Sequence, residues 1–236
     1  MIDSISIHQD LVLDNANKDQ NAALSYAQFN RISWRAQLSM IDYLTGNIKV
    51  ENAPSPPSNQ KNRDLLAPLI KKYPVQVVGG IITRPDDYYM YDNAYKLNGR
   101  LISDCDDDNI SRQECDTPIE ILSGDKFKVR CNTYIDELKP SFLKPIVKMV
   151  GKTFEFLPSD LGSIVLEYVR YPVRATIVTK LDPVYNDQVP DTALTTHFEW
   201  DEFARELLLW FMTDQFANSI REQALKTFNA ASNPKQ

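Results

Sequence analysis

Glycine is scarce in this chain of 236 residues: it has 7, about 3% against a usual ~7%. The glycine-rich phosphate-binding patterns GxxxxGK[ST] and GxGxxG are absent, as are GxSxG and HExxH. The sequence therefore lacks the signatures of nucleotide-phosphate binding, acyl transfer and zinc hydrolysis. Gly79-Gly80 follows a predicted strand without a third glycine, which favours a bulge or bend over a phosphate loop.

Cysteine and histidine are also few. The three cysteines, Cys105, Cys115 and Cys131, form no CxxC pair, so the sequence encodes neither a disulfide framework nor a zinc ribbon and favours a reducing compartment. His8 and His197 lie in separate predicted elements without a nucleophile nearby, and we interpret both as surface or partly packed residues. The sequence thus predicts no catalytic residue and no cofactor. A pocket converging on either histidine would support the contrary hypothesis, an enzyme.

No stretch approaches 18 apolar residues, and the N-terminus has no basic region followed by an apolar run. We therefore expect no membrane span, no signal peptide and an intracellular location at synthesis. Lys and Arg total 26 against 32 Asp and Glu, a formal net charge of −6. This balance argues against a protein whose main task is to hold DNA by neutralising phosphates, but it permits one past which DNA slides.

What is present indicates an α+β protein with an N-terminal helical hairpin, a central mixed or antiparallel β region and a long C-terminal helix. Residues 25–45 have a Ser25–Gln28 capping box and apolar residues three or four apart, with Gly46 at the expected end, and residues 4–16 predict a shorter helix. The β region is predicted at 75–83, 88–99, 145–150, 153–157 and 163–173, with short helices at 62–72 and at 123–138, the latter capped by Ser123.

The last predicted element is a helix from Asp201 to about residue 231, with acidic residues early and Lys226 late, as the helix dipole favours. Its length leaves two compatible arrangements open: packing on the 25–45 helix of the same chain, or on another subunit. With the proline-rich stretch at 52–60, these elements divide the chain into an N-terminal helical segment (1–50), a linker (51–61), a β-rich domain (62–200) and a C-terminal helix with tail (201–236).

An acidic run carries the sharpest local pattern. Asp104, Asp106 and Asp108 occupy positions 1, 3 and 5 of an EF-hand-like calcium loop, but Asn109 replaces the expected glycine and Cys115 the bidentate glutamate. These three aspartates are therefore weak metal candidates, and a solvated acidic surface loop is the favoured interpretation.

Charge is divided unevenly between neighbouring segments. Residues 86–120 contain ten acidic and three basic groups, whereas residues 124–152 contain seven basic and three acidic groups. Two interpretations remain: self-neutralisation within the fold, or a head-to-tail contact between subunits. The candidates for such a contact are Asp106, Asp107, Asp108, Lys144, Lys148 and Lys152.

Three stretches together resemble the neck connector (ring) proteins of crAss-like tailed bacteriophages, which are podoviruses. The first covers residues 17–48 and carries Lys18, Asp19, Gln20, Phe29, Asn30, Ala36, Gln37, Leu44 and Gly46. The second, residues 154–178, carries Pro158, Ile164, Leu166, Tyr168, Arg170 and Pro172. The third is THFEWDEFARELLLWF at 196–211. The acidic loop at 104–116 and the linker at 52–60 depart from the pattern.

The resemblance implies a structural virion protein and no catalysis. It implies a homo-oligomeric, dodecameric ring in the phage neck, assembled in the host cytoplasm, that contacts the portal protein or other neck rings while genomic DNA passes through its channel. The expected interface residues are Trp200, Phe203, Leu207, Trp210, Phe211, Ile220 and Phe228, although a role in the chain's own core is equally compatible with Trp210 and Phe211. The alternative function is a monomeric, cation-dependent binding module built around the 104–116 loop.

Overall fold

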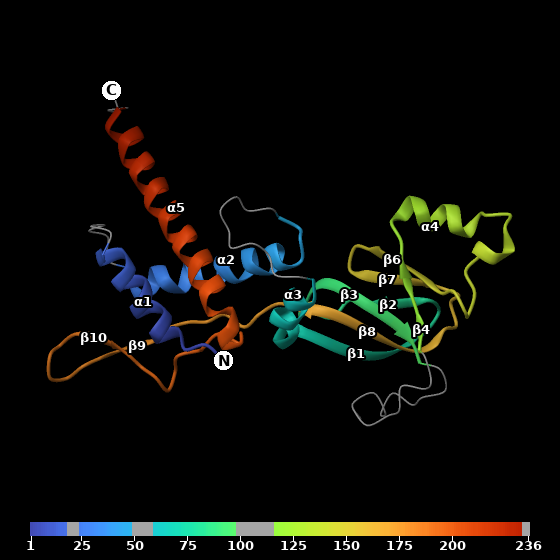
Figure 1. Cartoon of the computed structure of the whole chain (residues 1–236), viewed down its shortest axis with the longest axis horizontal. Coiled ribbons are helices and arrows are strands. Elements are labelled where there is room, and N and C mark those ends of the chain that lie inside the picture. The colour runs from blue at the N-terminus through green and yellow to red at the C-terminus, as the bar shows by residue number, and fades with distance from the viewer. Residues whose placement is uncertain (18–23, 49–58, 98–115, 233–236) are drawn as a thin grey trace. The chain divides into compact units, whose positions relative to one another are not determined.

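The computed structural model describes residues 1–17, 24–48, 59–97 and 116–232 and confirms the α+β class (Figure 1). The described chain forms two compact units. Unit 1 comprises Met1–Leu69 and Pro172–Gln236, and unit 2 comprises Ile70–Tyr171.

Helices dominate unit 1. They are α1 (Ser4–Asn17), α2 (Tyr26–Leu44), α3 (Asn59–Leu66) and α5 (Arg205–Ser232), with the 3-10 turns η1 (Ala67–Leu69) and η4 (Glu202–Ala204). The predicted capping box is present: the Gln28 amide donates to the Ser25 hydroxyl, and the Ser25 amide donates to the Gln28 side chain. The small hairpin of β9 (Thr179–Leu181) and β10 (Gln188–Pro190) completes the unit.

The first half of α5 packs on α2, which confirms the intramolecular arrangement foreseen for the C-terminal helix (Figure 1). Phe211 meets Tyr43 edge-on, with ring centroids 5.6 Å apart. The Trp200 indole, fully buried before α5 begins, donates to the buried Gln37 side chain at 3.2 Å. The apolar stripe of α2 is therefore covered from within its own chain.

Unit 2 contains two four-stranded sheets that share one core. The first has the order β1 (Ile70–Val77), β8 (Gly162–Arg170), β3 (Tyr88–Lys96) and β4 (Thr117–Pro118) and is antiparallel throughout. The second has the order β2 (Ile81–Thr83), β7 (Thr153–Leu157), β6 (Ile146–Val150) and β5 (Glu120–Ile121), with only β5 and β6 parallel. Leu166 and Tyr168 of β8 and Phe154 and Phe156 of β7 belong to the same buried cluster.

Some element boundaries differ from the predicted ones. The expected strand at 75–83 is interrupted because Gly79 and Gly80 both have positive φ, at 63° and 77°, and turn the chain from β1 into β2; this confirms the bend. The helix expected at 123–138 ends early, as α4 (Gly124–Cys131), followed by η3 (Asp136–Leu138). The short helix expected at 62–72 gives way to β1 at Ile70.

Unit 2 is inserted into unit 1, and its two ends lie together. Ile70 at the start of β1 is the pairing partner of Val169 near the end of β8. The predicted β-rich domain included residues 172–200. In the structure these residues belong to the helical unit 1. They do so because their backbone bonds to α2 and to residues 2–4 before and at the start of α1, as described below.

Candidate functional site

The predicted interface residues at the start of α5 fall into two groups. Phe203, in η4, is 94% exposed, while Leu207, Trp210 and Ile220 are partly buried. The side chain of Phe228 lies outside the described side chains. Of these predicted interface residues, Phe203 is thus the one whose aromatic ring is almost fully exposed to solvent.

The predicted interface role is wrong for Trp200 and Phe211. Both side chains are buried within the chain, Trp200 completely and Phe211 to 2% exposure, so neither offers surface to a partner. The reason is their packing: Trp200 bonds to Gln37 of α2, and Phe211 lies against Tyr43 of α2 and Trp210. They are core residues of unit 1.

All three stretches that carry the family resemblance contribute residues to this core. Phe29 and Phe198 pack edge-on with centroids 6.3 Å apart, and Gln37 receives the Trp200 hydrogen bond. The side-chain amide of Asn30 makes two hydrogen bonds to the backbone of Ile177. Its Nδ2 donates to the carbonyl at 3.0 Å, and its Oδ1 accepts from the N–H at 2.7 Å. These residues hold residues 175–200 onto α2. Lys18, Asp19 and Gln20 lie outside the described residues.

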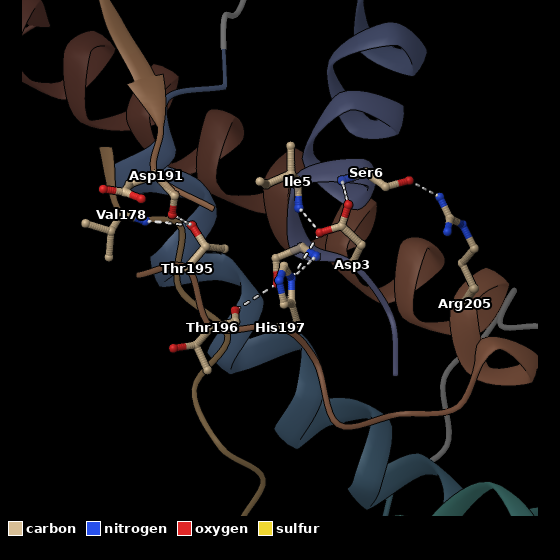
Figure 2. Close-up of polar contacts among 10 residues, drawn as sticks. Asp3, Ile5, Ser6, Val178, Asp191, Thr195, Thr196, His197 and Arg205 are labelled. Carbon is tan, nitrogen blue, oxygen red and sulfur yellow. Dashed lines mark hydrogen bonds and ion pairs between the residues drawn. The ribbon is translucent and has the colours of Figure 1, made fainter. Parts of the chain in front are cut away.

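A polar cluster ties the N-terminus to the segment before α5 (Figure 2). The backbone of Ile2 pairs with that of Phe198, and the Ser4 hydroxyl donates to the Thr196 carbonyl at 3.0 Å. Asp3 caps α1, accepting from the amides of Ile5 and Ser6 at 3.1 and 3.3 Å. The cluster therefore anchors the first turn of α1.

His197 belongs to this cluster. Its Nδ1 lies 3.2 Å from the Ser4 amide and 3.0 Å from the Asp3 carboxylate. A bare Nδ1 accepts from Ser4, whereas a protonated Nδ1 donates to Asp3, so the two contacts belong to different protonation states. Both contacts fix the chain terminus, which is a structural role.

Arg205 makes a second tie between α1 and the start of α5. Its guanidinium donates to the Asp10 carboxylate and the Ser6 hydroxyl, each at 2.6 Å, and to Glu202 at 3.0 Å. The hydrogen bond that Arg205 donates to Asp10 is the largest influence raising the pKa of Arg205 above its usual value. Sequence reasoning assigned no role to Arg205, because its partner lies 195 residues away.

A cavity of about 660 Å³ opens beside His8, lined by α1, the start of α2 and the β9–β10 hairpin. The imidazole Nε2 lies 2.9 Å from the Leu24 carbonyl, and its ring packs on Tyr26. Ser25, the hydroxyl nearest in sequence, bonds to Gln28 in the α2 cap. The cavity therefore brings a histidine to a surface pocket but presents no nucleophile bonded to a base among the described residues.

The basic segment 124–152 places its three predicted contact lysines in different settings. Lys148 bonds to Glu155 at 2.6 Å and lies over the Phe127 ring, so its charge is balanced locally. Lys144 is exposed and donates to the backbone carbonyl of Glu137, a neutral acceptor. Lys152 is exposed in the turn between β6 and β7. Among the described residues, self-neutralisation thus accounts for Lys148, whereas no described acidic side chain bonds to Lys144.

Lys144 borders a groove of about 200 Å³ in unit 2, here called the basic groove. Its apolar lining comes from Leu138, Leu143, Pro145 and Ile146, and Arg130 contributes the second cation. Arg130 bonds to Glu120 at 2.7 Å and to the Leu138 carbonyl at 3.2 Å, which holds the groove wall in place. Leu143 is 81% exposed. The sequence pattern did not reveal this groove, because its residues come from separate elements, β4, β5, α4, η3 and β6, that only the fold brings together.

The acidic candidates Asp104, Asp106, Asp107 and Asp108 lie outside the described residues. Within the described part of the chain, no group of three or more His, Cys, Asp or Glu side chains is placed to hold a metal ion. The helices described there include none that is long and apolar enough to span a membrane.

In comparisons with known proteins, no family model and no curated protein matches this chain.

Proposed function

We propose that this protein is a structural component of a phage virion that assembles into an oligomeric ring in the neck, connecting the portal and capsid to the tail around the DNA channel. The observation that supports the proposal is that exposed apolar side chains lie next to charged residues, which are acidic in unit 1 and include exposed lysine in unit 2. Phe203 stands beside acidic residues in unit 1, and the basic groove of unit 2 carries Leu143 beside Lys144. Such surfaces are typical of proteins that bind other proteins.

The use of the polar residues supports the same function. Asn30, Gln37 and Arg205 bind backbone or side-chain groups of their own chain, and His197 fixes the N-terminus. Polar side chains that are held by hydrogen bonds within their own chain stabilise a rigid subunit and do not form a reactive centre. A rigid subunit suits a ring, because small errors at each contact would accumulate around the closed circle.

The expected charge contact between subunits remains part of the proposal, with one refinement. Within the part of the chain that the structure describes, Lys144 and Lys152 are exposed, whereas Lys148 already binds Glu155, so we propose the first two as the lysines that meet a neighbour. Asp106, Asp107 and Asp108 are the proposed acidic partners on sequence grounds. A subunit with a net charge of −6 also suits a channel through which DNA passes without being gripped.

The mass of the purified protein in solution tests the proposal. Light scattering is recorded for the protein alone, with calcium, and with the portal protein. We expect a stoichiometric ring that forms when the portal supplies a docking site. A monomer indifferent to the portal would contradict the proposal, and a calcium-dependent change in that monomer would favour the cation-dependent binding module instead.

A triple change of Asp106, Asp107 and Asp108 to Lys tests the charge contact. We expect this variant to lose assembly and to remain a folded monomer. The matched control changes the exposed Asp64, Asp86 and Asp160 to Lys, which alters the charge by the same amount elsewhere. Normal assembly of the Lys variant would exclude this contact without excluding the ring.

A further inference from the structure

Among the described aromatic side chains of unit 1, Phe203 is the least buried, at 94% exposure. It lies in η4, whose turn is closed by the Ala204 amide donating to the Asp201 carbonyl at 2.9 Å. Glu206 follows three residues later, on the same side of the helical turn, and is exposed. Asp201, Glu202, Phe203 and Glu206 are here called the acidic knob. It is an aromatic ring surrounded by carboxylates on a rigid support.

The rigidity of the knob comes from Arg205. This side chain bonds to Glu202 and to Asp10 of α1, so the turn that carries Phe203 is fixed to the body of unit 1. A preorganised aromatic residue loses little conformational entropy on binding, which favours its use as an anchor.

The basic groove of unit 2 has the complementary properties. Its lining combines apolar side chains with the Arg130–Glu120 ion pair, its border carries the exposed ammonium of Lys144, which bonds to a backbone carbonyl, and its volume is about 200 Å³. A phenyl ring fits within this space, since a cavity of about 150 Å³ holds benzene. Leu138 and Leu143 would cover the faces of such a ring.

We propose that the acidic knob of one copy of this chain docks into the basic groove of a second copy. Phe203 enters between Leu138 and Leu143, and Glu206 pairs with Lys144. The inference deepens the proposed ring, on which it rests, by naming the surfaces through which neighbouring subunits meet. The two surfaces are different, so the contact can repeat head to tail from copy to copy, which is the kind of contact that builds a ring.

Charge favours a second copy as the occupant of the groove. The segment 124–152 is net basic in a chain whose total charge is −6, so the remainder of each copy is acidic. Two copies therefore repel over most of their surfaces and attract where this segment meets an acidic one. The acidic knob adds the apolar anchor that the groove lining requires.

A reciprocal charge exchange tests the contact, with the mass of the assembly measured by light scattering in the presence of portal protein. We expect Glu206→Lys and Lys144→Glu each to weaken assembly at least tenfold, because each sets like charges against one another. An equimolar mixture of the two variants is expected to recover assembly, since opposite charges then meet in an alternating ring. Asp64→Lys and Lys61→Glu on α3 are controls with the same charge changes, and we expect both to assemble normally.

Phe203→Ala tests the apolar part of the contact. We expect it to weaken assembly roughly tenfold or more, as loss of a central aromatic anchor does. Tyr185→Ala in the β9–β10 hairpin is the control, because it removes another exposed aromatic ring. Both side chains are exposed, so both variants are expected to keep the unfolding midpoint of the wild type.

The outcomes separate this inference from the proposed function. If the wild type forms a ring and the exchanged variants assemble equally well alone, or their mixture fails to recover, the knob and groove are not the contact and the ring proposal stands. If the wild type stays monomeric in every arm, both proposals fail.

Discussion

Asp87 joins strands of unit 2 through its carboxylate. Lys71 of β1 donates to it at 2.7 Å and the Tyr168 hydroxyl of β8 at 2.6 Å, while the Asp87 carbonyl accepts from the Tyr171 amide at 2.8 Å. Burial raises the pKa of Asp87, but the hydrogen bonds from Lys71 and Tyr168 outweigh it and leave the pKa below its usual 3.8. The ionised form is therefore the one that stabilises the fold.

We predict that Asp87→Asn lowers the free energy of unfolding by about 1 kcal/mol at pH 7, a modest figure because the ion pair with Lys71 is partly exposed. A carboxyl whose pKa is depressed on folding contributes stability above its unfolded pKa and loses it as the pH falls through the folded value. The difference between wild type and variant should therefore shrink below pH 3.8. Urea unfolding at several pH values measures it.

Asp86→Asn is the control for this prediction, since the neighbouring Asp86 is exposed. We expect the control to unfold like the wild type at every pH. An equal loss of stability in both variants would show that the effect is general electrostatics rather than the Asp87 network.

At the scale of the element, the ends of two helices provide a matched pair. The Ser25 hydroxyl caps α2 by accepting from the Gln28 amide, whereas Ser123 stands at the same position before α4 without a side-chain cap bond. We predict that Ser25→Ala lowers the free energy of unfolding by about 1 kcal/mol and that Ser123→Ala changes it by less than about 0.5 kcal/mol. Thermal unfolding followed by circular dichroism measures both. Equal effects would mean that the cap bond contributes nothing specific.

The same pair shows what sequence patterns capture at this scale. Both serines precede helical segments and both were predicted as caps, but only Ser25 has a Gln three residues later to complete the box. Helix α2 runs to its predicted end, whereas α4 stops at Cys131. The spacing of residues in the sequence predicts local hydrogen bonds such as a helix cap. The length of a helix depends also on the residues that pack along it.

At the scale of the whole molecule, unit 2 is a continuous stretch with its own core. Its first and last strands, β1 and β8, pair along their full length, so the chain enters and leaves the unit at one place. We predict that residues 70–171 expressed alone fold with a single cooperative unfolding transition, as inserted domains do. Differential scanning calorimetry checks this prediction. A broad, non-cooperative transition would show that unit 2 depends on unit 1.

Other parts of the candidate site were only partly predictable. The start of the C-terminal helix was foreseen as an interface, and Phe203 is exposed there, but Trp200 and Phe211 are core residues because α2 covers them. A stripe of apolar residues predicts that a face will be buried and does not identify its partner. The basic charge of 124–152 was visible, while the groove it borders depends on how α4, η3 and β6 fold together.

The sequence by itself determined the α+β class, the capped helix α2, the bend at Gly79-Gly80 and the opposite charges of neighbouring segments, because these follow from local spacing and composition. Tertiary structure alone decided that unit 2 is inserted into unit 1 between Leu69 and Pro172, that Asn30 and Arg205 bind partners far along the chain, and that Phe203 faces solvent while Phe211 does not. The physical reason is that burial and long-range hydrogen bonds are properties of pairs of segments. Which segments pair depends on the packing of the whole chain.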